Sequence, residues 1–176
     1  MARFLALLRA VNVGKRKVPM GALRRLCTDL GFDAVATYIA SGNLVFTASG
    51  RASAIEQQLE WALEREFGFA VDVMVRTPSQ FSKTLAATPF PKGEPSKVVL
   101  VVSKKKPMAA APKALEERGK AGERAAIAGG ALWIHYAGGI GKSKLTPALV
   151  DQAVGSPSTG RNLRTAQKLE EMLERD

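Results

Sequence analysis

Two short polar loops combine glycine with lysine, and they are the segments of this sequence best suited to bind a charged ligand. Asn12–Lys17 has the sequence NVGKRK, and Gly138–Thr146 has the sequence GGIGKSKLT. Each loop follows a hydrophobic run typical of a β-strand and precedes a segment with helical spacing. Glycine leaves backbone N–H groups accessible and lysine adds positive charge, so the combination favours anion binding. It does not specify a reaction.

The second loop partly resembles a phosphate-binding P-loop, through Gly141, Lys142 and Ser143. That motif needs an earlier glycine where this chain has Tyr136. Too little sequence follows Ser143 for the further strands and the acidic residue of such an enzyme. A P-loop enzyme is therefore not expected. Two interpretations stay open: a looser anion site in which Ser143 caps a helix, or a glycine-rich connection with two solvated lysines.

Few other residues suggest catalysis. His135 is the only histidine and lies in a strand-like segment, where it can act as a general base or simply pack. Acidic residues such as Glu56, Glu60 and Glu64 recur every four positions, which predicts a solvated helix face. The sequence has no local nucleophile motif and no cluster of metal ligands. We therefore expect neither a metal nor a cofactor.

The composition is strongly basic. The chain of 176 residues has 26 Lys and Arg against 16 Asp and Glu, a formal net charge of +10. The excess is spread over both halves of the chain, so it does not come from a basic tail. A distributed positive charge favours nucleotides, nucleic acids or other acidic partners, although solubility is an equally simple explanation.

The single cysteine, Cys27, excludes an intramolecular disulfide. Its spacing from Leu23, Leu26 and Leu30 places the thiol on the core face of a helix. The apolar opening segment is interrupted by arginines and has no cleavage site, and no apolar run approaches membrane-spanning length. We expect a cytoplasmic protein that does not enter a membrane.

Periodicity predicts the order βαββαβ in the first half of the chain. The expected strands cover 3–11, 34–40, 44–48 and 71–76, and the expected helices cover 19–30 and 52–67. This order is that of a ferredoxin-like unit. Residues 41–43 would form the turn between the second and third strands.

The second half repeats the pattern after a linking helix at 79–87. The expected strands cover 97–103, 123–128, 131–136 and 158–162, and the expected helices cover 110–118, 145–154 and 165–175. We predict an α+β fold of two tandem ferredoxin-like subdomains with antiparallel sheets, a linking helix and a C-terminal helix. The predicted boundaries are 1–78 for the first subdomain, 79–96 for the linking helix and loop, and 97–176 for the second subdomain.

This topology gathers residues that are far apart in the sequence. The loop after the first strand and the turn after the second share one end of a ferredoxin-like sheet, so Asn12–Lys17 should lie near Ser41 and Asn43. By the same reasoning, Lys142 and Lys144 should lie near Arg161 and Asn162. Two polar, basic clusters are expected.

Nucleic acid is one candidate partner, because ferredoxin-like sheets often stack bases on exposed aromatic side chains. Aromatic residues are few here, and Tyr38 and Phe46 suit a core as well as a stacking surface. Trp61 and Trp133 are expected in a core or a domain contact. The run of lysines at 104–106 is more typical of a solvated loop than of a phosphate track.

Four separated motifs resemble one known family. The motifs LLRAVNVGKRKVPM, TYIASGNLVF, GIGKSKLT and TGRNLRTAQKL occur in the order found in the bacterial family named domain of unknown function 1697. The resemblance implies the duplicated ferredoxin-like architecture and supplies no reaction. The positions that it marks are Arg9, Asn12, Gly14, Ser41, Gly42, Asn43, Ser143, Lys144, Thr146, Arg161 and Asn162.

The chain departs from the family pattern at several of the proposed binding positions. Lys15 stands where a second glycine is common, and Lys142 stands where arginine is frequent. Gly160, Leu163 and Arg164 replace what are typically Thr, Trp and Asn. The second cluster is therefore more basic and less aromatic than the resemblance implies.

The sequence thus favours a cytoplasmic protein that binds a phosphate-bearing anion, such as a nucleotide, a phosphorylated small molecule or a nucleic-acid backbone. Lysine and arginine would neutralise its charge, while asparagine and serine would add directional hydrogen bonds. The candidate ligand-binding residues are Arg9, Asn12, Gly14, Lys17, Ser41, Asn43, Gly141, Lys142, Ser143, Lys144, Arg161 and Asn162. The alternatives are a transferase or hydrolase that moves a proton through water or His135, and a structural or protein-interaction role.

Overall fold

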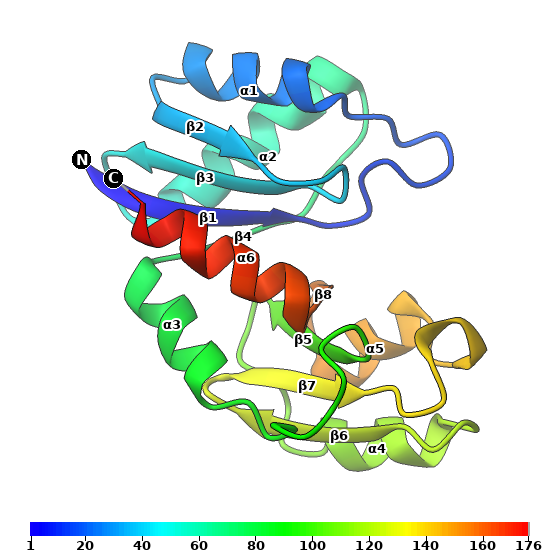
Figure 1. Cartoon of the computed structure of the whole chain (residues 1–176). Coiled ribbons are helices and arrows are strands. Elements are labelled where there is room, and N and C mark those ends of the chain that lie inside the picture. Colours follow the sequence, from blue (N-terminus) through cyan, green and yellow to red (C-terminus); the bar gives the residue numbers. More distant parts are fainter. Residues whose placement is uncertain (176) are drawn as a thin grey trace. The chain divides into compact units, whose positions relative to one another are not determined.

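Two four-stranded antiparallel sheets and six α-helices make up this α+β fold in the computed structural model, which describes residues 1–175 (Figure 1). The chain divides into two compact units. The first contains Met1–Phe81 and the segment that begins at Leu169, and the second contains Ser82–Lys168. The finer division into 1–78, 79–96 and 97–176 stays a prediction.

The first unit places two helices on one face of its sheet (Figure 1). Its elements are β1 (Ala2–Leu8), α1 (Met20–Asp29), β2 (Asp33–Thr37), β3 (Asn43–Ala48), α2 (Ala52–Phe67) and β4 (Val73–Arg76), and the strand order is β2-β3-β1-β4. Cys27 is fully buried in this core, as predicted. Burial raises the pKa of its thiol to about 12, so the thiolate that would react is absent near neutral pH.

The second unit has the same strand order as the first, β6-β7-β5-β8. Its elements are α3 (Pro78–Ala86), which begins in the first unit, β5 (Val98–Ser103), α4 (Ala111–Arg118), β6 (Arg124–Ala128), β7 (Ala131–His135), the 3-10 turn η1 (Ile140–Lys142), α5 (Pro147–Val154), β8 (Ser158–Asn162) and α6 (Leu163–Glu174), which ends in the first unit. Val99, Val101 and Ile134 pack with Leu115 of α4 and Val150 of α5 in its core.

Every predicted strand and helix is present, with ends displaced by a few residues. The weakly signalled strand at 158–162 is confirmed as β8, which pairs with β5 from Val99↔Asn162 to Ser103↔Ser158. Its sequence, STGRN, has little strand propensity. The hydrogen bonds to the apolar strand β5 therefore decide its conformation.

Two carboxylates that were predicted to be solvated instead protect an edge strand, so that prediction was wrong for them. Glu60 Oε1 accepts the N–H of Val73 at 2.9 Å, and Glu56 Oε2 accepts that of Val75 at 2.8 Å. β4 is an outer strand of its sheet, and its outward N–H groups would otherwise be open to pairing with another chain. Glu116 of α4 does the same for Ala125 in β6, at 3.0 Å.

The two tryptophans differ in environment. Trp133 is fully buried and donates to the carbonyl of Ala128 at 3.1 Å, as expected for a core residue. The expectation for Trp61 was wrong, because 59% of this residue is exposed on α2, with the guanidinium of Arg65 stacked 4.6 Å from the ring centroid. Across the described residues, no helix has both the length and the apolar character needed to cross a membrane.

Candidate functional site

The loop at 12–17 leads from β1 to α1 (Figure 1) and is closed by backbone hydrogen bonds. Asn12 N donates to the carbonyl of Arg16 at 2.6 Å, and Arg16 N donates to that of Val13 at 3.1 Å. Gly14 has a φ of +56° at the tip, a conformation in which side chains are unfavourable. Lys15 and Lys17 are exposed.

The side chain of Asn12 holds this loop in place. Its Nδ2 donates to Val18 O at 2.9 Å and to Ala40 O at 2.6 Å, while Oδ1 accepts from Val18 N at 2.9 Å. The contact with Ala40 confirms that the loop lies beside the β2–β3 connection. Both protons of the amide are used, so Asn12 fixes the loop and has no donor left for a ligand.

The β2–β3 connection is fixed by Asn43, which is fully buried. Its Nδ2 donates to Tyr38 O at 2.8 Å and to Ser41 Oγ at 3.0 Å. Gly42 has a φ of +88°, and a Cβ there would lie 2.7 Å from side-chain atoms of Leu8 and Val11. The motif Ser41–Asn43 is therefore a buried turn, and its asparagine does not face a ligand.

Two arginines flank this region. Arg9 follows β1, is partly buried, and donates its backbone N–H to Asp72 O at 2.9 Å. Arg16, which the sequence did not single out, donates through Nε to Ala10 O at 2.6 Å and through Nη2 to Ala70 O at 2.7 Å. Its guanidinium also stacks on Phe69 at 4.6 Å. Arg16 therefore stabilises the base of the loop.

A buried carboxylate anchors the 138–146 loop of the second unit. Ser143 Oγ donates to Glu123 Oε1 at 2.7 Å and accepts from Leu145 N at 3.1 Å. The other carboxylate oxygen of Glu123 accepts from Ala121 N at 3.0 Å. Glu123 is 5% exposed and directly precedes β6. Ser143 is thus bonded to a carboxylate and does not cap a helix, while Thr146 caps α5 by accepting from Leu149 N at 3.2 Å.

Glycines make room for this anchor. A Cβ at Gly119 would meet the carboxylate of Glu123, and a Cβ at Gly138 would lie 2.8 Å from Ala121 O.

The hydrogen bond from the Ser143 hydroxyl, together with hydrogen bonds from backbone N–H groups, lowers the pKa of Glu123, although burial acts in the opposite direction. Burial and the nearby Glu123 charge raise the pKa of Tyr136 to about 12. Glu123 was not identified from the sequence, because it has no motif around it.

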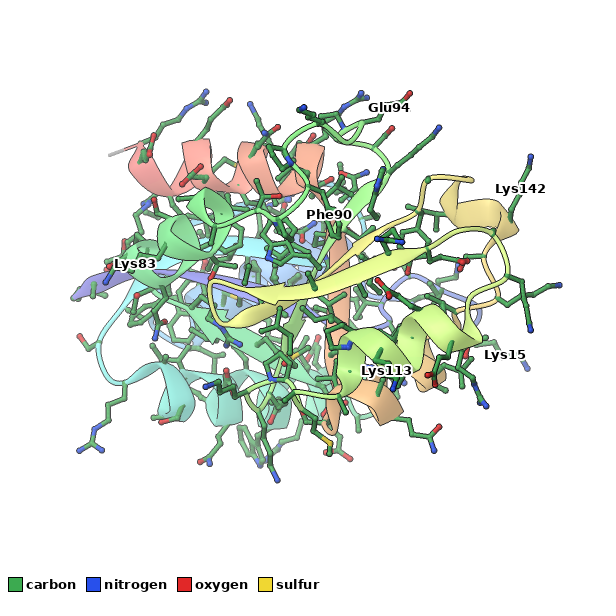
Figure 2. The ribbon with its side chains drawn as sticks, turned by 90° about the horizontal axis from the view of Figure 1, so that it is seen from below. Lys15, Lys83, Phe90, Glu94, Lys113 and Lys142 are labelled. Atoms are coloured by element: carbon green, nitrogen blue, oxygen red, sulfur yellow. The ribbon has the colours of Figure 1, made fainter. Side chains whose placement is uncertain are left out.

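The rest of the loop faces outward. Lys142 and Lys144 are exposed, and Figure 2 shows the Lys142 side chain pointing away from η1. Gly139 has a φ of +93°, and the space around Gly141 is open. The backbone N–H groups of Ile140 and Gly141 make no hydrogen bond within residues 1–175.

Arg161 and Asn162 do not join these lysines, contrary to the expected cluster. They lie at the same end of the sheet but in β8, whereas Glu123 and Ser143 hold the loop beside β6. β6 and β8 are opposite edges, separated by β7 and β5, which is about 14 Å at ~4.8 Å per strand.

Both residues also have structural contacts. Arg161 is 8% exposed and donates to Thr159 Oγ1 at 2.6 Å and to Gly160 O at 2.9 Å, and burial lowers its pKa to about 10. Asn162 Oδ1 accepts from Thr165 N at 2.9 Å at the start of α6.

His135 lies on the other face of the sheet from Tyr136, and its ring is 5.5 Å from that of Phe90, within the connection to β5 (Figure 2). It is therefore not placed to move a proton at the 138–146 loop. Among the described residues, no group of three or more His, Cys, Asp or Glu side chains is arranged to hold a metal ion.

Comparison with known proteins agrees with the motifs. The chain belongs to the family described as "Protein of unknown function (DUF1697)", whose model matches residues 1–133 and so ends before the 138–146 loop. A similar solved structure is that of a conserved bacterial protein from Streptococcus pneumoniae, with a TM-score of 0.78, 24% sequence identity and 99% of each chain covered. At this identity the likeness shows the fold alone. No curated protein matches the chain.

Proposed function

We propose that this is a cytoplasmic protein that binds a phosphate-bearing anion, a nucleotide or a nucleic-acid backbone, through the 12–17 and 138–146 loops. One observation carries the proposal. Four exposed lysines, Lys15, Lys17, Lys142 and Lys144, make no ion pair with any described residue, and they lie on loops whose backbones are fixed by internal hydrogen bonds.

Rigid loops suit this role. A flexible segment loses conformational entropy when it binds, so a segment that is already ordered keeps more of its interaction energy. In the first unit the order comes from Asn12 and Asn43, and in the second from Glu123 and Ser143. The asparagines thus contribute to binding by holding the loops. Directional hydrogen bonds to the anion come from backbone N–H groups, such as those of Ile140 and Gly141.

A transferase or hydrolase is the second candidate. The observation in its favour is the short hydrogen bond from the partly exposed Ser143 hydroxyl to Glu123, which pairs a nucleophile with a carboxylate. The lowered pKa of Glu123 makes this carboxylate a weak base, and His135 faces elsewhere. Anion binding without turnover therefore agrees better with the geometry. A structural or protein-interaction role is the third candidate, and the experiments below favour it if no phosphate-bearing compound binds.

The finer description of the fold also belongs to this proposal. We propose that both units are ferredoxin-like and arose by duplication. The element order βαββαβ in each unit supports it, as does the shared strand order. The 12–17 loop follows β1 and the 138–146 loop follows β7, so the two loops do not occupy equivalent positions in the two units. The experiment below tests the 138–146 loop.

A thermal-shift screen tests the anion site. The purified protein is compared with Lys142→Ala and with Lys113→Ala, which removes one exposed lysine from α4 of the same unit (Figure 2). A ligand at 100 times its Kd adds about 2.7 kcal/mol, or roughly 5–10 °C in Tm for a chain of this size. Nucleotides, sugar phosphates and short RNA are screened at fixed ionic strength.

We expect a rise in Tm that is reduced in Lys142→Ala and retained in Lys113→Ala. No rise with any phosphate-bearing compound, or an equal reduction in both variants, would contradict the proposal and favour a protein-interaction role. Chromatography of the bound nucleotide after incubation distinguishes the enzyme from the binding protein, because only the enzyme yields product.

A further inference from the structure

The exposed surface of α1 carries two arginines whose guanidinium groups converge over a glycine. Arg25 Nη1 and Arg24 Nη2 lie 3.7 and 3.8 Å from the position that a Cβ of Gly21 would occupy. Arg24 is held in this orientation by a hydrogen bond of 2.6 Å from its Nη1 to Thr37 Oγ1 of β2. Two positive groups are thus directed to one point on the helix surface.

Neither Arg24 nor Arg25 forms an ion pair with any residue between 1 and 175. Asp29 lies further along the same helix face and is not within ion-pair distance of either guanidinium. Two neighbouring like charges repel each other. An anion bound between them would remove this repulsion and accept hydrogen bonds from both.

The arginines line a hollow of about 400 Å³, together with Gly21, Thr28 and Asp29. The absence of a side chain at residue 21 leaves the space in front of the two guanidiniums free. The Thr28 hydroxyl donates to Arg24 O at 3.1 Å, so it does not supply a donor to the hollow. The available donors are the guanidinium N–H groups.

We infer that this hollow is a binding site for the phosphate group of a small phosphorylated molecule, with Arg24 and Arg25 as its ligands. The planar guanidinium matches the oxygens of a phosphate and donates two parallel hydrogen bonds to it. Convergence on a single point selects one compact anionic group. None of these residues belongs to the 12–17 or 138–146 loop, so the site does not depend on the proposed function.

Substitutions of Gly21 test the site without removing either arginine. Gly21→Asp places a carboxylate at the point where the two guanidiniums converge, so the protein supplies its own anion and excludes phosphate. Gly21→Ala adds only a methyl group, at an ordinary contact distance from both nitrogens, and should bind as the wild type does. Comparison of Gly21→Asp with Gly21→Ala distinguishes the effect of a negative charge on phosphate binding from the effect of a larger side chain.

Titrations followed by two-dimensional NMR of backbone amides localise the binding. The probes are inorganic phosphate, adenosine 5′-monophosphate and a short RNA oligomer, each at constant ionic strength. We expect saturable shifts at Gly21, Arg24 and Arg25 with the first two probes. Arg24→Ala or Arg25→Ala should weaken binding at least tenfold, equivalent to about 1.4 kcal/mol. The matched control is Arg51→Ala, which removes an exposed arginine of the same unit that forms no ion pair with residues 1–175.

Several results would overturn the inference. These are unsaturable shifts spread over all basic residues, a loss in Arg51→Ala equal to that in Arg25→Ala, or retained binding in Gly21→Asp. Binding of the RNA oligomer alone would also overturn it, because a nucleic-acid surface needs no small-molecule site. Lys142→Ala and Lys17→Ala, measured in parallel, separate the two proposals: they should leave the shifts at Gly21 unchanged even if the loops bind nothing.

Discussion

Replacement of Glu123 by glutamine tests whether a buried carboxylate fixes the 138–146 loop. Glutamine keeps the shape of the side chain but turns one of its two oxygens into an NH2 group. In the native protein, one oxygen accepts from Ser143 Oγ at 2.7 Å and the other from Ala121 N at 3.0 Å. The amide oxygen of glutamine can still accept from Ala121 N, but its NH2 group then faces Ser143, whose hydroxyl must turn and accept instead of donate. Both hydrogen bonds to a charged group become neutral hydrogen bonds.

The expected loss of stability follows from the lost charge. A hydrogen bond to a charged group is worth about 1.5–3 kcal/mol and a neutral one about 0.5–1.5 kcal/mol, so the two bonds together lose about 2–3 kcal/mol. For a chain of this length, 1 kcal/mol changes Tm by roughly 2–4 °C. We therefore expect Glu123→Gln to lower Tm by roughly 4–12 °C. The close packing of Glu123 against Gly119 leaves little room for the side chain to rotate toward another partner.

Calorimetry and urea unfolding of five proteins provide the measurement. The wild type is compared with Glu123→Gln and with Glu117→Gln, which makes the same substitution at an exposed position of α4. Ser143→Ala and the double variant complete a cycle, and residues in contact should show a coupling of about 0.5–3 kcal/mol. Equal stability of Glu123→Gln and Glu117→Gln would refute the reasoning, as would additive effects in the cycle.

The same contact predicts a pH dependence. The pKa of Glu123 is lowered in the folded protein by its hydrogen bond from Ser143, whereas an unfolded glutamate titrates near 4.3. Its contribution to stability is therefore fully present above about pH 4.3 and is lost as the pH falls through the folded pKa. The difference in stability between the wild type and Glu123→Gln should stay constant from pH 7 to about 5 and narrow below. A constant difference down to pH 3 would contradict this.

Substitutions at three further positions test the packing described above. Gly42→Ala should lower stability by about 2–4 kcal/mol, because it combines a positive φ with close contacts to Leu8; a loss below 1 kcal/mol in urea unfolding would contradict this. Asn43→Ala removes two buried hydrogen bonds and should cost about 2–3 kcal/mol by the same assay. Glu56→Gln should lower stability by about 1–2 kcal/mol, because glutamine can still accept from Val75 but brings no charge to this hydrogen bond or to the Arg76 ion pair; light scattering should show no aggregation, which Glu56→Ala is expected to cause.

The elements were predictable from the sequence because apolar periodicity and glycine turns mark them. β1 and β5 are mostly apolar strands in the middle of their sheets, and α2 has apolar residues every four positions. Even β8, which has a polar sequence, followed from the topology once the first unit had set the pattern. Contact between Asn12 and the β2–β3 connection followed from the same topology.

The hydrogen-bond partners of individual polar side chains could not be predicted from the sequence. Polar residues in a motif were expected to face a ligand, yet Asn43 and Arg161 are buried and bond to their own chain. Burial of a polar group is visible only in three dimensions, where a backbone acceptor comes within reach. Glu123 was missed for the same reason, since its partner Ser143 lies 20 positions away. The position of the loop beside β6 depends on that contact.

Calorimetric titration tests the central claim of anion binding most directly. The best ligand from the thermal screen is titrated into the wild type, the double variant Lys142→Ala/Lys144→Ala and Lys113→Ala. We predict a Kd at least tenfold higher for the double variant and unchanged for Lys113→Ala, with the difference shrinking as salt concentration rises. A Kd that is the same in all three proteins would contradict binding at the 138–146 loop.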